Sequence, residues 1–452
     1  MQSLKNVFTA TGVSLFSPRV LAIAGPMIIA NVSVAMLGLV DLAVLGHLNQ
    51  PHYLGGVALA GIIFDFLYWG MTFLRMGTTG VVARAVGDRD FTTVRTLLVQ
   101  GLLLALLLAG VMLLARMQVL AFSLSLLDGS PDAESAAGLY FRARILGAPA
   151  ALATMVLLGW LIGMQNGRAV LAVTVTVNLI NLVLDLWFVV GLGWGVRGVA
   201  LAGVIAEYVG VLVAGVLVLG GLREAGGKWS WRDVLDRHRL TALVKLNGNI
   251  MLRTLCLIAT FAFFTNRSAQ FGDAQLAANA ILLKLLLTMS LATDGFANAT
   301  EALVGAAVGA RSRARYDFAV TVCGRWSLLI AVAFSLGFAL FQAPLTGIMT
   351  SLPAVADAAA RYWPWLVLAP LLSVWCFVLD GIFIGAMRAT EMRNAMLFAA
   401  GGVFLPAFYL GRDLGNHGLW LAFMLFFLAR GVAMAAQLGR IEHMFEADAA
   451  AH

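Results

Sequence analysis

The chain has 452 residues, of which 61% are hydrophobic and only 12% are charged. This composition excludes a soluble globular protein and indicates an all-α polytopic membrane protein. The net charge of +7 would favour a nucleic acid partner in a soluble protein. In a membrane protein the bias of Lys and Arg toward cytoplasmic loops explains it, so we expect no nucleic acid partner.

Twelve apolar segments follow one another along the chain and predict twelve transmembrane helices. They cover residues 18–46, 54–86, 96–118, 137–164, 169–192, 198–222, 246–267, 274–309, 317–342, 362–387, 392–411 and 416–439. Lys and Arg cluster in alternate connections, above all between Arg223 and Lys245, which predicts that both termini are cytoplasmic. The predicted domains are an N-lobe at 1–222, a cytoplasmic loop at 223–245, a C-lobe at 246–441 and a cytoplasmic tail at 442–452.

An internal repeat relates the two halves of the chain. The tripeptide at 85–87 recurs at 307–309, a shift of 222 positions. The same shift aligns residues of the fourth and tenth segments, namely Tyr140, Val156, Leu157, Gly159, Ile162 and Gly163 with Tyr362, Val378, Leu379, Gly381, Ile384 and Gly385. One register over two separate segments predicts two six-helix lobes related by a pseudo-twofold axis along the membrane normal, an arrangement common in transporters.

The N-lobe carries ionisable and amide side chains at membrane depth. Between Val20 and Gly46 the one ionisable residue is Asp41, and Pro26 in the same segment predicts a helix hinge. Asn178, Asn181 and Asp185 follow at i, i+3 and i+7, on one helix face. At 1.5 Å per residue, Asp41 and Asp185 both lie roughly 7–10 Å below the outer surface. We expect these residues to line a cavity, and a structural polar zipper between helices is the alternative.

Three further polar side chains of the N-lobe are candidates for a substrate cavity: Tyr140, Thr154 and Glu207. Glu207 lies about nine residues from the outer end of its segment, roughly two and a half turns below the surface. An ion pair with a helix-terminal arginine such as Arg197 explains this carboxylate nearly as well.

The C-lobe has its own buried charges. Arg253, Glu301 and Asp380 lie at similar depths from the inner ends of their segments, and Asp294 lies two turns deeper than Glu301. The shared depth predicts one network that binds a cationic substrate or relays protons. Paired charges that only stabilise the lobe are the alternative.

Several longer segments resemble the multidrug and toxic compound extrusion (MATE) transporters, specifically their DinF-like branch, over roughly residues 16 to 440. The segments that carry the resemblance are GLVDLAVLGHL (38–48), FLRMGTTGVVARAVG (73–87), NLINLVLDLWFVVGL (178–192), TDGFANATEA (293–302) and LDGIFIGAMRATEMRN (379–394). The resemblance implies a V-shaped, two-lobe exporter of amphipathic, often cationic compounds that is driven by a proton or sodium gradient. It also implies an ion-coupling site at Asp41, Asn181 and Asp185, with Asn178 alongside.

Two departures from the family favour protons over sodium. Members that coordinate a cation can use a hydroxyl early in the sixth helix, but residues 198–203 read GVALAG. Thr154 stands where an amide is expected. Hard cations want about six oxygen ligands. We therefore expect proton coupling, with sodium as the alternative.

Other functions lack their usual motifs. There is no GxxxxGK[ST] phosphate loop and no HExxH, and Cys256, Cys323 and Cys376 lack metal-ligand spacing, so we expect no metal, no cofactor and no enzymatic activity. A lipid-linked saccharide flippase of the same superfamily would require a more cationic cavity, and a polytopic membrane transferase would require carboxylates nearer the surface. We expect a monomeric protein of the bacterial inner membrane whose partners are small amphipathic or cationic substrates and the lipid bilayer.

Overall fold

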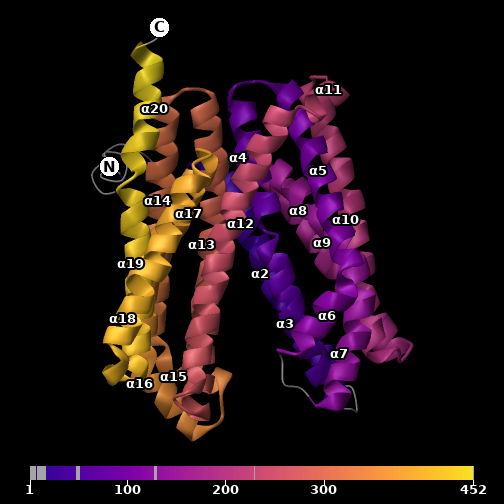
Figure 1. Ribbon diagram of the computed structural model, residues 1–452, viewed down its shortest axis with the longest axis vertical. Helices are drawn as coiled ribbons and strands as arrows, with labels where there is room; N and C mark the ends of the chain where they lie inside the picture. The colour runs from indigo at the N-terminus through magenta and orange to yellow at the C-terminus, as the bar shows by residue number, and fades with distance from the viewer. Residues whose placement is uncertain (1–6, 8–16, 47–50, 127–129, 229, 451–452) are drawn as a thin grey trace. The chain divides into compact units, whose positions relative to one another are not determined.

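The computed structural model describes residues 7, 17–46, 51–126, 130–228 and 230–450 (Figure 1), of which 37–46, 51–54 and 447–450 are described by their backbone alone. No strand occurs among these residues, and eleven helical stretches within them are long and apolar enough to cross a membrane. The predicted segment at 392–411 falls instead on α17 (Ala389–Leu397), the π-helical η3 (Phe398–Phe404) and α18 (Leu405–Leu410). The predicted all-α, multi-pass fold is confirmed.

Two compact units divide the chain. We call Ile29–Val244 the N-unit, and Lys245–His452 together with the residues up to Ile28 the C-unit. Both boundaries fall inside long helices, α2 (Pro18–Gly46) and α12 (Arg237–Ala269), and the first lies shortly after Pro26, the proline inside α2. The first part of α2 therefore packs in the C-unit, where Gly295 lies against Ala24 and Ile28.

The N-unit consists of the second part of α2 and the helices up to the start of α12. These helices are α3 (Pro51–Gly70), α4 (Phe73–Gly87), α5 (Phe91–Leu114), α6 (Arg116–Leu124), α7 (Pro131–Arg144), η1 (Ile145–Gly147), α8 (Ala148–Gly163), α9 (Gly167–Asp185), the π-helical η2 (Leu186–Gly191), α10 (Gly195–Ala225) and α11 (Trp231–Val234).

The C-unit contains most of α12 and the helices that follow it. Besides α17, η3 and α18 they are α13 (Asp273–Gly309), α14 (Arg313–Leu340), α15 (Gln342–Met349), α16 (Pro353–Gly385), η4 (Arg412–Leu414), α19 (Asn416–Ala435) and α20 (Leu438–Ala450). The core between α12, η3 and α19 is aromatic. Phe423 of α19 packs on Phe261, Phe264 and Phe404 with ring centroids 4.9–6.5 Å apart.

The internal repeat is confirmed by the way each unit packs its own helices. In the N-unit α8 crosses α4 so closely that a Cβ at Gly159 would lie 2.5 Å from the carbonyl oxygen of Arg75. In the C-unit α16 crosses α13 the same way, since a Cβ at Gly381 would lie 2.5 Å from the carbonyl oxygen of Ala297. Gly159 corresponds to Gly381, and Arg75 corresponds to Ala297, at the shift of 222 positions. Small residues such as glycine allow membrane helices to approach this closely.

The turns repeat as well. Among the described residues, the non-glycine positions with positive φ are Arg89 and Gln165 in the N-unit and Arg311 and Met387 in the C-unit, which are two pairs at the same shift. After Arg89, Asp90 caps α5 by accepting a hydrogen bond from the Thr93 N–H at 2.9 Å. After Arg311, Ser312 caps α14 in the same way through the Arg315 N–H. Equivalent helix ends are thus built alike in the two units.

Candidate functional site

A polar stripe on α9 faces the interior of the N-unit. Asp185 is fully buried and Asn181 is 7% exposed, whereas Leu179 and Val183 on the opposite face are 56% and 61% exposed. Asn178 donates a hydrogen bond through Nδ2 to Ser33 Oγ of α2 at 2.8 Å. The structure therefore places the three predicted residues of α9 on one inward face and joins that face to α2.

The first predicted segment is one helix, α2, which contains both Pro26 and Asp41. The side chain of Asp41 lies outside the described residues, as residues 37–46 are described by their backbone alone. The pairing of Asp41 with Asp185 and the hinge at Pro26 stay predictions. Ser33, on the same helix, is joined to the stripe by its hydrogen bond with Asn178.

A second polar centre of the N-unit surrounds Glu207 of α10. Its carboxylate pairs with Arg144, the last residue of α7, so its ion-pair partner is Arg144 and not Arg197. The Arg144 guanidinium also lies over the rings of Phe64 and Tyr68 of α3, 5.7 Å from each centroid. Arg144 lies inside the predicted segment 137–164. The structure ends α7 at this residue and continues the chain with the 3₁₀ turn η1, which was not predicted.

The other two cavity candidates of the N-unit, Tyr140 and Thr154, lie before and after Arg144 in the chain. Tyr140, one turn before Arg144 on α7, makes an edge contact with Phe64 at 6.1 Å between centroids. Thr154 lies in α8, and its Oγ1 is buried without a hydrogen-bond partner among the described residues. The structure therefore brings Tyr140 to the Arg144–Glu207 centre, whereas Thr154 Oγ1 lies 3.9 Å from the position that a Cβ at Gly210 of α10 would take.

The C-unit holds a buried cluster of charges. Arg253 of α12 and Arg430 of α19 both donate through Nη2 to Oδ2 of Asp380 on α16, and all three residues are at most 6% exposed. Asp294 of α13 also interacts electrostatically with Arg253. The predicted grouping of Arg253, Asp380 and Asp294 is therefore present, with Arg430 as an additional member.

Arg430 was not predicted from the sequence, although the sequence carries a signal for it. It is a lone charge inside the apolar segment 416–439, the same feature that singled out Asp41. Glu301, the fourth predicted residue of the network, is 2% exposed on α13. It lies where the backbone of α13 meets Gly385 of α16.

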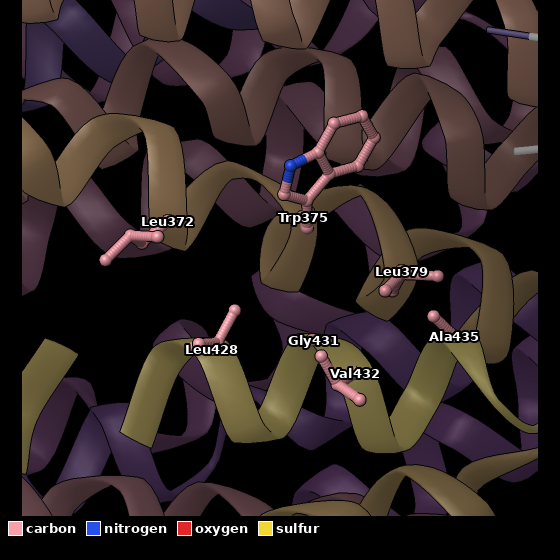
Figure 2. Close-up of a pocket in the computed structure, with 7 residues that line it drawn as sticks. All are labelled: Leu372, Trp375, Leu379, Leu428, Gly431, Val432 and Ala435. Carbon is pink, nitrogen blue, oxygen red and sulfur yellow. The ribbon is translucent and has the colours of Figure 1, made fainter. Parts of the chain in front are cut away.

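A pocket of about 300 Å³ opens between α16 and α19 in the C-unit. Figure 2 shows Leu372, Trp375 and Leu379 on one side and Leu428, Gly431 and Val432 on the other, with Ala435 at one end. The lining is apolar apart from the Trp375 indole N–H. The pocket is lined by α16 and α19, the helices that also carry Asp380 and Arg430 of the charge cluster.

Among the residues that the structure describes, no three His, Cys, Asp or Glu side chains come together in one group. The buried groups instead are carboxylates, amides and arginines on membrane-spanning helices. Such groups bind protons, small ions or charged organic molecules.

Comparisons with known proteins agree with this reading. The MatE family model matches residues 26–187 and 250–410, more than half of the chain. DNA damage-inducible protein F of Escherichia coli K12 is 42% identical over 414 residues, covering 92% of this chain and 90% of that protein. Protein DETOXIFICATION 44 of Arabidopsis thaliana is 26% identical over 449 residues, covering 95% of this chain and 83% of that protein.

A solved structure shares the fold. It is described as the outward-facing conformation of a multidrug resistance MATE family transporter of the MOP superfamily. It matches with a TM-score of 0.86 and 20% identity, covering 94% of this chain and 96% of that one. The two stretches that the family model matches fall in the two halves of the internal repeat. The chain therefore belongs to the MatE family, in the DinF-like branch of its E. coli relative, and is a multi-pass membrane transporter, not an enzyme.

Proposed function

We propose that this transporter exports amphipathic, often cationic compounds across the bacterial inner membrane in exchange for protons. It acts as a monomer with both termini in the cytoplasm. The observation that carries the proposal is the inward stripe of Asn178, Asn181 and the fully buried Asp185 in a membrane-spanning helix. A carboxylate at that depth is stable when it holds a proton or a cation, which is the property that an antiporter needs.

Competition at one site couples the two movements. A cationic compound is held by the ionised carboxylates of Asp41 and Asp185, and a proton that enters from outside removes that counter-charge. The loss of the charge weakens the bound cation and favours its release, because a ligand shifts an equilibrium only by its differential affinity. The neutral carboxyl can then donate a hydrogen bond to an amide such as that of Asn181.

Sodium is the alternative coupling ion, and the composition of α10 argues against it. Residues 198–203 in its first turns contain no hydroxyl side chain, so this helix offers no side-chain oxygen there to a cation at the stripe. Protons need no such shell. The absence of those oxygens therefore supports proton coupling.

A lipid-linked saccharide flippase would require free cationic groups for its phosphates. The two buried arginines of the C-unit are held by Asp380, and the N-unit arginine Arg144 is held by Glu207. Each of these arginines is therefore paired with a carboxylate of its own unit. This supports an exporter of cationic compounds over a flippase.

The proposal is tested by measuring the uptake of a cationic compound into inverted vesicles, where export appears as uptake, under an imposed pH or sodium gradient. We expect D185N and D41N to abolish export driven by the pH gradient while both proteins stay folded and inserted. D357N is the matched control, because Asp357 is an exposed carboxylate on α16 and its loss should leave export unchanged. Wild-type export by D185N, or export that collapses when sodium is removed at a constant pH gradient, would contradict proton coupling.

A further inference from the structure

The Arg144–Glu207 centre of the N-unit has the composition of a receptor for organic cations. We call Phe64, Tyr68 and Glu207 the cation cage. Its present occupant is the guanidinium of Arg144, which pairs with the carboxylate and lies 5.7 Å from both ring centroids. A carboxylate combined with aromatic faces is how proteins bind guanidinium and ammonium groups, because the ring quadrupole attracts a cation that has left water.

The cage has binding capacity that Arg144 does not use. Glu207 Oε2, Arg144 Nη1 and the Tyr68 hydroxyl are buried, and none has a hydrogen-bond partner among the described residues. In a centre that only holds helices together, such polar atoms are normally paired. Here an acceptor and a hydroxyl stay open beside the cation.

The centre is also adjustable and reachable. Arg144 is the last residue of α7, directly before the 3₁₀ turn η1, where the helical hydrogen bonding changes. The side chains of Arg144 and Glu207 keep 17% and 14% exposure. The absence of a side chain at Gly147 and Gly203 accommodates the pair, since a Cβ at Gly203 would lie 3.1 Å from Arg144 Nε and one at Gly147 would meet the Glu207 carboxylate.

We propose that the cation cage is a binding subsite for a planar monocation, a guanidinium or amidinium group of a transported compound. Arg144 is its resident ligand, which the compound displaces. The identification of the ligand as transport cargo rests on the proposed function, whereas the affinity of the cage for a guanidinium group does not. The cage thus favours compounds with delocalised, flat cationic groups, which stack on rings and pair with carboxylates better than compact ammonium groups do.

The test is to vacate the cage and offer a free ligand. Full-length R144A, purified in detergent, is titrated with methylguanidinium and, in parallel, with its neutral isostere methylurea, and binding is followed by calorimetry and by thermal stability. We expect R144A to bind methylguanidinium and to be stabilised by it, and methylurea to have no effect. The double variant R144A/E207Q should bind about tenfold more weakly or worse, because it lacks the counter-charge.

Two arginines elsewhere supply matched controls. Arg267 lies over two rings, Phe263 and Phe408 at 5.1 and 5.6 Å, but hydrogen-bonds the neutral Gln270 amide. Arg388 pairs with the Glu391 carboxylate at 3.0 Å and lies over no ring in the described part of the chain. R267A and R388A each keep half of the cage chemistry, so neither should bind methylguanidinium as R144A does.

Each outcome decides the matter. If R144A is not recovered alone, its recovery as folded protein with methylguanidinium but not with methylurea supports the cage, and equal recovery with both or with neither overturns it. Folded R144A that does not bind methylguanidinium also overturns it. If R144A binds methylguanidinium while wild-type vesicles show no export driven by a pH or sodium gradient, the proposed function fails and the cage stands. If export is present and binding is absent, the reverse holds.

Discussion

Arg430 of α19 donates a hydrogen bond to Asp380 of α16, and both side chains are buried in the C-unit. Arg253 donates to the same carboxylate oxygen, so the Asp380 charge faces two positive charges, and Asp294 adds a second negative charge near Arg253. The three residues come from three helices, α12, α16 and α19, which the cluster ties together. Because both arginines share the Asp380 carboxylate, we expect the loss of Asp380 to lower the stability of the protein more than the loss of Arg430.

We expect D380N to destabilise the protein by about 3 kcal/mol or more, because it strands two buried arginines. R430M should cost clearly less, because it leaves the Arg253–Asp380 pair neutral and replaces the guanidinium by an apolar chain. Denaturation of the purified variants in detergent measures both. Equal losses would mean that the cluster does not depend on the Asp380 charge.

Helix approach through glycine gives a second prediction. G381A places its Cβ 2.5 Å from the carbonyl oxygen of Ala297, so the two helices must separate, at a cost of about 1–3 kcal/mol. G159A should behave alike in the N-unit. Gly215 of α10 is the control, because nothing lies within 4 Å of its Cβ position, and G215A should stabilise the protein by about 0.4–1 kcal/mol. Melting curves of the three variants check the order.

The internal repeat aligns the glycines of these two helix crossings, but it does not identify the buried arginines Arg144 and Arg430. Gly159 and Gly381 stand at one register because both halves need the same helix crossing, so an alignment of the chain with itself finds them. Arg430 corresponds to Tyr208 and Arg144 to Leu366 at the shift of 222, so the repeat carries no information about either arginine. Their partners depend on tertiary packing, which a single sequence does not reveal.

The ends of the long apolar helices were predicted from the sequence, but the interruptions inside helices were not. The predicted segments 18–46 and 274–309 agree closely with α2 and α13, because long apolar runs with polar ends define a membrane helix. The interruptions at η1 and η3 were not predicted. Each keeps the chain helical and apolar, so neither hydropathy nor periodicity marks it.

Topology is open to a direct test with cysteines in a background without Cys256, Cys323 and Cys376. S130C, before α7, should react with an impermeant maleimide added outside intact cells. K228C, between α10 and α11, should react only after the membrane is opened, because the basic 223–245 connection is expected inside. Both positions lie outside the helices and are exposed, so burial does not prevent labelling. Reaction of both from the same side would refute the predicted orientation.

The cap of α5 predicts a pH dependence outside the membrane-spanning segments. Partial burial raises the pKa of Asp90, but hydrogen bonds from the Thr93 hydroxyl and N–H and the charge of Arg239 outweigh it, so the pKa ends below its ordinary value. A carboxyl whose pKa is lowered by folding stabilises the protein above its ordinary pKa of about 3.9 and loses that contribution as the pH falls through the lowered value.

At neutral pH, D90A should therefore cost about 1 kcal/mol, the usual value of an N-cap. D90S copies the cap that Ser312 provides at the equivalent turn and should keep most of this stability without titrating. Melting temperatures of the wild type and D90S should differ more at pH 6 than at pH 3, in favour of the wild type at pH 6. A difference that does not change with pH would show that the Asp90 carboxylate contributes no more than a hydroxyl does at this turn.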